Sequence, residues 1–414
     1  MENKNTPKLR FKEFDDEWET KLFKEIISIN RGLTYKPSDI VIDGVRVLRS
    51  SNIDEDTFKI FEDDVFVNEE VVKIPFVENG DILVTAANGS SRLVGKHAIV
   101  NNVKQKTVHG GFMLIVKSQN PNFVNSWMNS YEYKKTLQLV QGGNGAIGNL
   151  SKPILENTVM TIPVKTSEQS AIGMLFQTLD ELLSAYKDNL ANYQAFKATM
   201  LSKMFPKAGQ TTPEIRLDGF EEEWKFVRLN DIAEKVKEKN KDNLYTETFT
   251  NSAEFGIVNQ RDFFDKDISN EKNLNSYYVV QNDDFVYNPR ISNFAPVGPI
   301  KRNKLGRTGV MSPLYFVFRI KENIIVSFDY LETVFNNRQW HKFMKLNGDS
   351  GARSDRFSIK DSVLMIMPIP FPSIDEQRAI GAFFSNLDDL IASQQVKIAE
   401  LETLKKKLLQ DMFV

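Results

Sequence analysis

Hydrophobic residues recur at alternating steps of four and three over residues 168–205 and again over residues 376–413. This spacing is the apolar seam of a long helix with a heptad pattern. Neither stretch contains a proline, and Thr166-x-x-Gln169 and Ser373-x-x-Glu376 predict a capped start for each helix. Each helix would be on the order of 57 Å long. So narrow an apolar stripe needs a partner, and we expect the other helix to provide it.

The two stretches are copies of each other, displaced by 208 positions without a gap. Polar residues interrupt both seams at one shared position, Lys197 and Lys405. The seam residues that we expect to hold the helices together and to form the docking surface are Ile172, Phe176, Leu179, Leu183, Tyr186, Ile380, Phe384, Leu387 and Ile391.

The repeat extends beyond the helices. Thr6-Pro7-Lys8-Leu9-Arg10 followed by Glu17-Trp18 returns as Thr212-Pro213-Glu214-Ile215-Arg216 followed by Glu223-Trp224. Residues 150–163 and 357–370 also match and read as a closing strand ahead of each helix. The order is therefore opening motif, variable body, closing strand and long helix, written twice.

The two bodies share their order of elements while their sequences differ. In the first, β-branched runs predict strands at 45–48, 81–85, 98–100 and 112–116, followed by a helix over 122–140. In the second, strands are predicted at 277–280, 284–287 and 314–320, followed by a helix over 328–346. This pattern indicates two diverged copies of one α+β module.

Pro206 and Pro213 bracket a linker that contains Gly209, and they mark the boundary between the halves. The predicted segments are a first domain over 1–163, a central helix over 164–206, a second domain over 207–371 and a C-terminal helix over 372–414.

Composition excludes several kinds of chemistry. The 414-residue chain has no cysteine, which removes disulfides, thiolate metal sites and cysteine nucleophiles. Its histidines, His97, His109 and His341, are too scattered to predict a metal site. No segment has the length and apolarity of a membrane span, and residues 1–10 are charged, so we expect a cytoplasmic protein. The net charge of −2 leaves any nucleic-acid binding to local patches.

Motifs that resemble catalytic or nucleotide sites fail on context. Residues 143–148 read G-x-G-x-x-G, but they follow a predicted helix and lead into a strand, whereas a dinucleotide loop follows a strand and opens a helix. Gly89 to His97 imitates a phosphate loop with the wrong spacing. Asn288-Pro289-Arg290 lacks the second proline and the aromatic residue of an adenine methyltransferase motif. We predict that the chain has no catalytic centre of its own.

Loops after the predicted strands gather residues suited to DNA. Arginine and asparagine side chains can form bidentate hydrogen bonds with base edges, and serine, lysine and backbone amides can bind phosphates. For a single residue an ordinary polar loop is the alternative, but the loops cluster at corresponding places in both bodies. The candidate DNA-binding residues are Arg49, Ser51, Asn52, Asn88, Ser90, Ser91, Arg92, Lys96, Asn288, Arg290, Asn293, Arg353, Ser354 and Arg356.

A Thr-Pro-x-[Ile/Leu]-Arg opening, an Ile-Pro closing strand and a Glu-Gln-x-Ala-Ile-Gly helix start, each occurring twice, resemble the specificity subunit of type I restriction-modification systems. The resemblance spans the whole chain. It implies an α+β fold with two tandem target-recognition domains, each a curved β-sheet plus helices, separated by two long antiparallel coiled-coil helices in a pseudo-twofold repeat.

The resemblance also implies a function in defence against foreign DNA. Each domain would read one half of a bipartite site in double-stranded DNA, and the helices would set the spacer and dock two modification subunits. Those partners bind S-adenosylmethionine and methylate adenine, and two optional restriction subunits use ATP and Mg²⁺. This chain itself would bind no cofactor or metal and would not be an enzyme. The alternatives are a coiled-coil scaffold that joins proteins without reading DNA, and a self-contained methyltransferase.

Overall fold

A computed structural model describes residues 5–141, 149–263, 271–350 and 355–414. The chain forms two compact units. Unit 1 comprises Met1–Asp188 and Val396–Val414, and unit 2 comprises Asn189–Gln395. Each unit therefore contains the beginning of one long helix and the end of the other.

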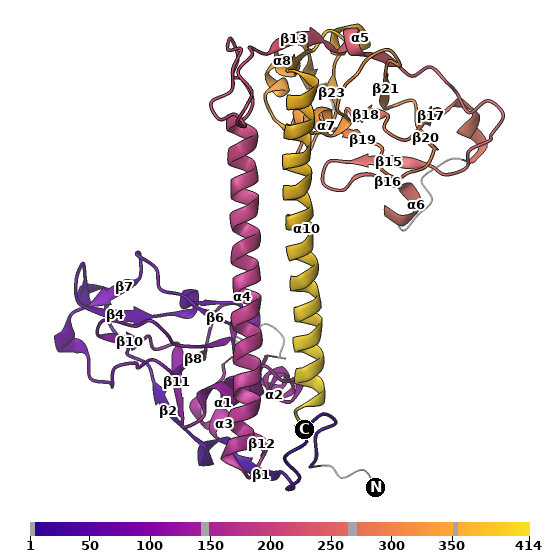
Figure 1. Cartoon of the computed structure of the whole chain (residues 1–414). Coiled ribbons are helices and arrows are strands. Elements are labelled where there is room, and N and C mark those ends of the chain that lie inside the picture. Colours follow the sequence, from indigo (N-terminus) through magenta and orange to yellow (C-terminus); the bar gives the residue numbers. More distant parts are fainter. Residues whose placement is uncertain (1–4, 142–148, 264–270, 351–354) are drawn as a thin grey trace. The chain divides into compact units, whose positions relative to one another are not determined.

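The two long helices are α4 (Thr166–Lys203) and α10 (Ile374–Asp411), each of 38 residues (Figure 1). The start signal predicted at Ser373 is present in part, because its hydroxyl accepts a hydrogen bond from the Glu376 amide at 3.3 Å. The Glu376 side chain does not return to the cap and binds an arginine instead. Both β-strands and short helices precede each long helix, which confirms the predicted α+β fold.

The elements of unit 1 before α4 lie in chain order. They are β1 (Glu19–Leu22), β2 (Ile27–Arg31), β3 (Ile40–Val41), β4 (Val45–Leu48), β5 (Ile53–Asp54), β6 (Thr57–Phe58), β7 (Val65–Val67), β8 (Ile82–Thr85), β9 (His97–Ile99), β10 (Thr107–His109), β11 (Met113–Ser118), α1 (Pro121–Met128), α2 (Tyr131–Gln141), α3 (Lys152–Glu156) and β12 (Val159–Ile162).

Unit 2 follows the same general order between α4 and α10. Its elements are β13 (Lys225–Arg228), α5 (Leu229–Ile232), β14 (Ala233–Lys235), β15 (Phe249–Ser252), β16 (Gly256–Asn259), α6 (Gln260–Phe263), β17 (Tyr278–Val280), β18 (Phe285–Tyr287), β19 (Ile300–Arg302), β20 (Gly309–Met311), β21 (Phe316–Ile320), α7 (Phe328–Asn336), α8 (Trp340–Asn347), β22 (Asp349–Ser350), β23 (Phe357–Ser358), α9 (Asp361–Leu364) and β24 (Pro368–Phe371).

One four-stranded antiparallel sheet is common to both units. Its order is β2-β11-β8-β9 in unit 1 and β14-β21-β18-β19 in unit 2. The turn before the edge strand contains a glycine with positive φ in each case, Gly95 at 84° and Gly298 at 82°. The backbone amides of Thr85 and Asn288 donate to the carbonyl of the residue after that glycine, at 2.8 and 2.9 Å. Thr85 and Asn288 therefore occupy equivalent positions in the two sheets.

The repeated opening and closing segments pair with each other. β1 runs antiparallel to β12, and β13 runs antiparallel to β24. Both closing segments also contain a short helix, α3 or α9, before the strand, which corrects the prediction of a plain closing strand. The repeat therefore encodes a two-stranded ribbon at the base of each long helix.

The two predicted body helices are each broken in the structure. Residues 122–140 divide into α1 and α2 at Asn129-Ser130, and residues 328–346 divide into α7 and α8. In unit 2 the break has a tertiary cause, since extended Asn337 donates its side-chain amide to the Leu201 carbonyl at 2.7 Å, near the end of α4. The hydrophobic periodicity of the sequence does not reveal this long-range hydrogen bond.

The main core of each unit joins the sheet and short helices of the body to both long helices. In unit 1, Phe413 at the end of α10 packs on Phe123 of α1 and Phe176 of α4, with ring centroids 5.9 Å apart in both pairs. In unit 2, Phe205 after α4 packs on Trp224 and Tyr330. The repeated Met-Phe pair thus anchors the end of each long helix.

Candidate nucleic-acid interface

A buried ion pair fixes each opening segment to the start of a long helix. Arg10 donates two hydrogen bonds to Glu168 at 2.6 and 2.7 Å, and Glu168 is 1% exposed. Arg216 does the same to Glu376, at 2.7 and 2.8 Å. The hydrogen bonds that Arg10 donates to Glu168 outweigh the opposing effect of burial and raise the pKa of Arg10. These repeated residues therefore have a structural role in holding each opening segment against the start of its long helix.

A repeated glycine lets a body helix approach each long helix. A Cβ on Gly173 would lie 2.7 Å from the Phe123 amide, and one on Gly381 would lie 2.9 Å from the Tyr330 amide. The neighbouring glutamines, Gln169 and Gln377, donate to the carbonyls of the prolines that precede the helices, at 2.9 and 3.0 Å. The Glu-Gln-x-Ala-Ile-Gly motif is thus a docking frame for the variable body.

The lysines that interrupt the seams form equivalent ion pairs. Lys405 lies 2.7 Å from Asp180 and 3.4 Å from Asp56 in unit 1. Lys197 pairs with Asp388 in unit 2. Burial lowers the pKa of Lys405, but the charges of Asp180 and Asp56 outweigh it, so the pKa is raised. Lys405 therefore stays charged and links both helices to the loop after β5.

Two loops of unit 1 that were predicted separately from the sequence lie together at the ends of β4 and β8. Asn88, after β8, donates to the Ser50 hydroxyl, after β4, at 3.1 Å. Asn88 also accepts from the Ser90 amide at 3.0 Å. The asparagine thus shapes the surface by joining two loops, while Ser51, Ser90, Ser91 and Arg92 are exposed beside it and Lys96 is half-buried.

Asn52 lies in the interior, which corrects the prediction that it contacts DNA. It is 1% exposed and donates to the Lys59 carbonyl and the Asp64 carboxylate, at 2.9 and 2.8 Å. Its oxygen accepts from the Arg49 amide at 2.8 Å. Asn52 therefore positions the neighbouring Arg49, whose guanidinium is exposed and bonds to none of the described residues.

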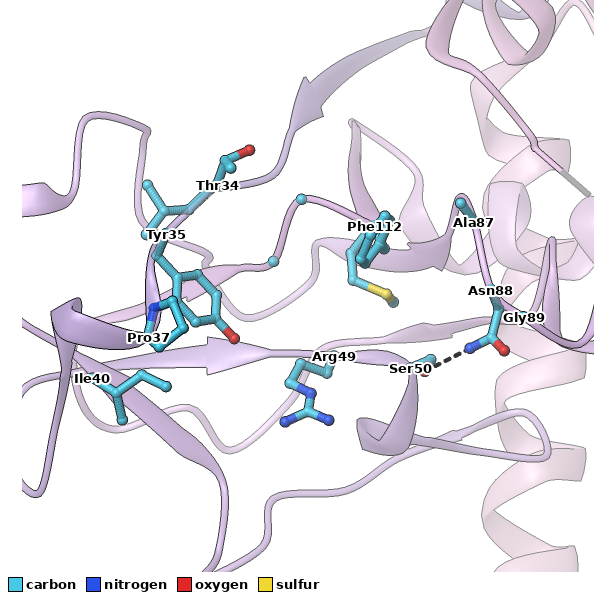
Figure 2. A pocket seen from close by; sticks show the side chains of 14 residues that line it. Thr34, Tyr35, Pro37, Ile40, Arg49, Ser50, Ala87, Asn88, Gly89 and Phe112 are labelled. Carbon is cyan, nitrogen blue, oxygen red and sulfur yellow. Dashed lines mark hydrogen bonds between the residues drawn. The ribbon is translucent and has the colours of Figure 1, made fainter. Parts of the chain in front are cut away.

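The same strand ends surround a hollow of about 750 Å³. Its lining includes Tyr35, Arg49, Asn88 and Phe112 (Figure 2). Phe112 precedes β11, and its side chain is 74% exposed, so the prediction that it is a strand residue was wrong. Tyr35 was not among the residues predicted from the sequence. The Gly110-Gly111 pair directly before Phe112 was the available signal for a turn at that point.

In unit 2 the structure joins two further predicted loops. Arg290, after β18, forms a β-bridge with Arg356, and the Phe357 amide donates to the Pro289 carbonyl at 2.7 Å. Both arginines are exposed, as is Asn293. Asn288 is half-buried and donates to the Asn251 carbonyl at 2.8 Å, which makes it a loop-shaping residue. Arg353 and Ser354 lie outside the described residues.

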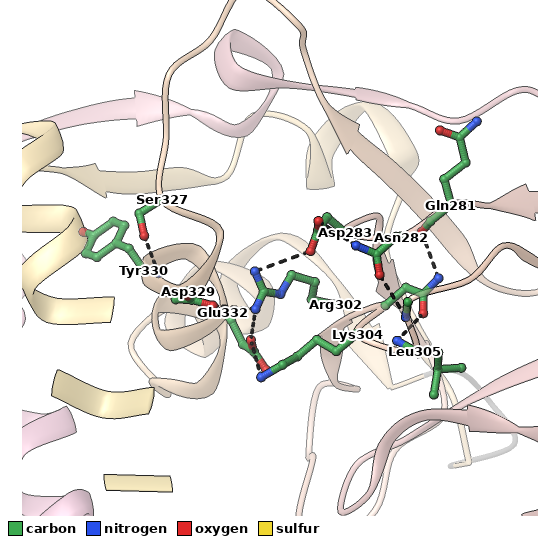
Figure 3. A network of polar contacts seen from close by, with 12 residues as sticks. Gln281, Asn282, Asp283, Arg302, Lys304, Leu305, Ser327, Asp329, Tyr330 and Glu332 are labelled. Carbon is green, nitrogen blue, oxygen red and sulfur yellow. Dashed lines mark hydrogen bonds and ion pairs between the residues drawn. The ribbon is translucent and has the colours of Figure 1, made fainter. Parts of the chain in front are cut away.

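A polar network holds β19, and hence the loop from β18, against α7 (Figure 3). Arg302 is 3.5 Å from Asp283, 2.5 Å from Asp329 and 3.0 Å from Glu332. Lys304 lies 3.3 Å from Glu332. Because the Arg302 side chain is only 8% exposed, its charge fixes the frame and is not presented to a ligand.

The seam residues divide by burial. Most are buried in the cores of the two units, namely Ile172, Phe176, Leu179, Leu183, Ile380, Phe384 and Leu387. Tyr186 and Ile391 are half-buried. The buried residues hold this chain together, so they do not offer a free surface to another subunit. Exposed hydrophobic residues lie elsewhere on the helices, at the repeat-equivalent positions Leu182 and Leu390, which are 43% and 46% exposed.

The G-x-G-x-x-G sequence at 143–148 lies outside the described residues. Within the described ranges, no His, Asp and Glu side chains form a group of three or more that could hold a metal ion. In that same part of the chain, no helix combines the length and apolarity needed to cross a membrane.

Comparisons with known proteins agree with this architecture. Residues 221–403 match the type I restriction modification DNA specificity domain. A Methanocaldococcus jannaschii protein assigned as the specificity subunit of the MjaX type I restriction enzyme is 23% identical, over 98% of this chain and 95% of its own. The MjaVIII specificity subunit of the same organism is 22% identical, over 83% of this chain and 79% of its own.

A solved structure shares the fold across the whole chain. The crystal structure of a type I restriction-modification system S subunit from M. genitalium aligns with a TM-score of 0.59 at 13% sequence identity. The alignment covers 99% of each chain. The doubled architecture is therefore shared even where few residues are identical.

Proposed function

We propose that the chain is a specificity subunit of a type I restriction-modification system and that it reads a bipartite DNA site with one unit per half-site. The observation that carries the proposal is the contrast between frame and loops. The ion pairs Arg10–Glu168 and Arg216–Glu376 recur, whereas the loops at the strand ends differ in sequence between the units. Two constant frames with different loops suit two independent half-sites.

The exposed cations supply the base-reading chemistry that the proposal needs. Arg49 in unit 1 and Arg290 and Arg356 in unit 2 are exposed at the ends of sheet strands. An arginine fork can bond to the two acceptors of guanine in the major groove. Backbone amides and the serines of loop 88–92 suit the phosphates. The net charge of −2 favours a complex in which partner subunits share the phosphate contacts.

The long helices would receive two modification subunits on their outer faces and set the spacer between half-sites. Leu182 and Leu390 support this assignment because the repeat keeps the same exposed residue in both copies. Phe196 and Leu404, also equivalent by the repeat, are each 45% exposed. Large apolar side chains that remain exposed at equivalent positions are typical of subunit contacts.

The chemistry would take place in the partners. The modification subunits would bind S-adenosylmethionine and methylate one adenine per half-site, and two optional restriction subunits would use ATP and Mg²⁺. The chain would contribute target choice and geometry, and we place the assembly in the cytoplasm. This division of labour agrees with the prediction from the sequence that the chain has no catalytic centre of its own.

The test is co-expression with the modification subunits, followed by sequencing of methylated adenines in host DNA. The proposal predicts one two-part motif with a fixed spacer. Arg290→Ala should relax one half of that motif, at a cost of about 1–3 kcal/mol for a lost bidentate contact. Methylation without a motif, or none despite complex formation, would favour a protein scaffold.

Docking is tested separately. Leu182→Glu and Leu390→Glu should each weaken binding of one modification subunit, and the double variant should weaken both. Ile42→Glu is the matched control, because Ile42 is fully exposed on the turn after β3. Binding that is unchanged in the double variant would exclude these faces.

A further inference from the structure

The hollow in unit 1 combines features that suit one flat aromatic ligand. Phe112 stands 74% exposed at its rim, and Tyr35 lies across the lining in Figure 2. Among the described residues that line it, Arg49 carries the only charge. Planar guanidinium and aromatic groups are the side chains on which nucleobases stack and to which their edges bond.

The exposure of Phe112 is built into the fold. The Phe112 carbonyl accepts from the amides of Ala86 and Ala87, at 2.9 and 3.2 Å. The next amide, that of Met113, closes a turn onto Gly110 at 2.8 Å. These bonds tie the backbone of Phe112 to the loop that carries Asn88, while leaving its ring outside the core.

Unit 2 keeps a large apolar residue at a comparable place. Leu314 lies just ahead of β21, the counterpart of β11, and is 58% exposed. At this position the exposed side chain is apolar in both units, and it is aromatic in unit 1. The aromatic residue at this position is the reason that the proposal concerns the half-site of unit 1.

We propose that the hollow in unit 1 holds a single nucleobase that leaves the stack of its half-site, between Phe112 and Tyr35 with Arg49 at its edge. The inference rests on the proposed function and deepens it. The volume of about 750 Å³ lies within the range of small-ligand pockets. The glycine backbone at Gly110-Gly111 removes side chains that would block close approach.

The cost of unstacking and unpairing the base provides the test. A base whose pairing partner is missing is cheaper to extract, so a protein that extracts it binds such a duplex more tightly. Using the complete complex with its modification subunits, affinity is measured for duplexes in which the residue opposite each half-site base is made abasic in turn.

The methylated adenine of each half-site serves as an internal standard, because methyltransferases extract their target base. The half-site of unit 1 should show one further position at which the abasic partner tightens binding by roughly tenfold. The half-site of unit 2 should show only the standard.

Phe112→Ala and Arg49→Ala should remove the additional tightening and leave the standard of the unit 2 half-site unchanged, whereas Phe112→Trp should retain the additional tightening. Ile42→Ala and Leu314→Ala are the matched controls and should behave as the native chain does. All four positions are exposed, so the fold is not at risk.

The failures of the two proposals are distinguishable. If binding is specific for a bipartite site but only the methylated adenine shows tightening, the nucleobase site is overturned and bipartite reading stands. If the complex binds all duplexes alike, the proposed function fails, and the nucleobase site fails with it.

Discussion

The Lys405 ammonium lies 2.7 Å from the Asp180 carboxylate, where it joins the end of α10 to the first half of α4 within unit 1. The repeat places the same two residue types at Lys197 and Asp388 in unit 2. The lysine that interrupts each apolar seam therefore forms an equivalent ion pair in each unit.

The two lysines should differ in their contribution to stability. Lys405→Ala leaves Asp180 and Asp56 facing each other and should cost about 2 kcal/mol, because Lys405 is only 13% exposed. Lys197→Ala should cost under about 1 kcal/mol, because Asp388 is 50% exposed. Urea unfolding monitored by hydrogen exchange in each unit measures both. Equal costs would contradict the assigned difference in burial.

Gly173 and Gly381 should not tolerate a methyl group. Gly173→Ala would force α1 away from α4, because the added Cβ would meet the Phe123 amide at 2.7 Å. We expect a loss of about 1–3 kcal/mol, typical of overpacking, in unit 1 alone. Gly381→Ala should act likewise on unit 2.

Gly89→Ala is the control for these glycine variants, since no atom lies within 4 Å of its added Cβ. The stability of the Gly89 variant should match the native value in thermal unfolding. Native stability of the Gly173 variant would show that α1 does not depend on close contact with the helix.

His109 should make unit 1 sensitive to acid. Its Nε2 lies 3.1 Å from the Asn30 carbonyl, and burial lowers its pKa from 6.5 to about 4. A lowered folded pKa means that the unfolded chain binds more protons, so stability is full above pH 6.5 and is lost as the pH falls towards 4. The loss attributable to this group is about 3 kcal/mol.

His109→Asn tests this sign directly. Urea midpoints at pH 7, 5.5 and 4.5 should fall less steeply for the variant than for the native chain, whatever its stability at pH 7. His97 and His341, whose pKa values are also lowered by burial, remain in both proteins and cancel in the comparison. Parallel pH profiles would show that His109 is not buried as a neutral group.

The spacer should respond to the length of the helix. Four residues inserted after Asp188 in α4 would add roughly 6 Å by the helical rise, against about 3.4 Å per base pair. The methylated motif should gain one or two unspecified base pairs while its half-sites stay unchanged. The same insertion at exposed Asp43, outside the helix, should leave the spacer as it was. An unchanged spacer in the α4 variant would mean that the helices do not set the distance.

The sequence predicted the frame because the residues of the frame occur twice in one register. It did not predict that Arg10 pairs with Glu168 or that Lys405 pairs with Asp180, since both contacts join residues far apart in the chain. The helix break before α8 was missed for the same reason: Asn337 leaves the helix to bond Leu201. Local periodicity does not record such bonds.

The candidate interface was predicted less completely than the frame. Arginine and asparagine were chosen together for their base-reading chemistry, but the two types separate in the structure. Arg49 and Arg290 are exposed, while Asn52 is buried and Asn88 has bonds within its loops. Asparagine favours turns as readily as base contacts, and sequence alone does not distinguish these uses. Phe112 was missed because an aromatic residue beside a strand resembles core.

The most direct test of the central claim is an exchange of residues 1–150 for those of a relative that has a different motif. Co-expressed with the same modification subunits, the hybrid is assayed by sequencing methylated adenines. Independent units predict that one half of the motif changes while the other half and the spacer stay the same. A change in both halves would contradict the account.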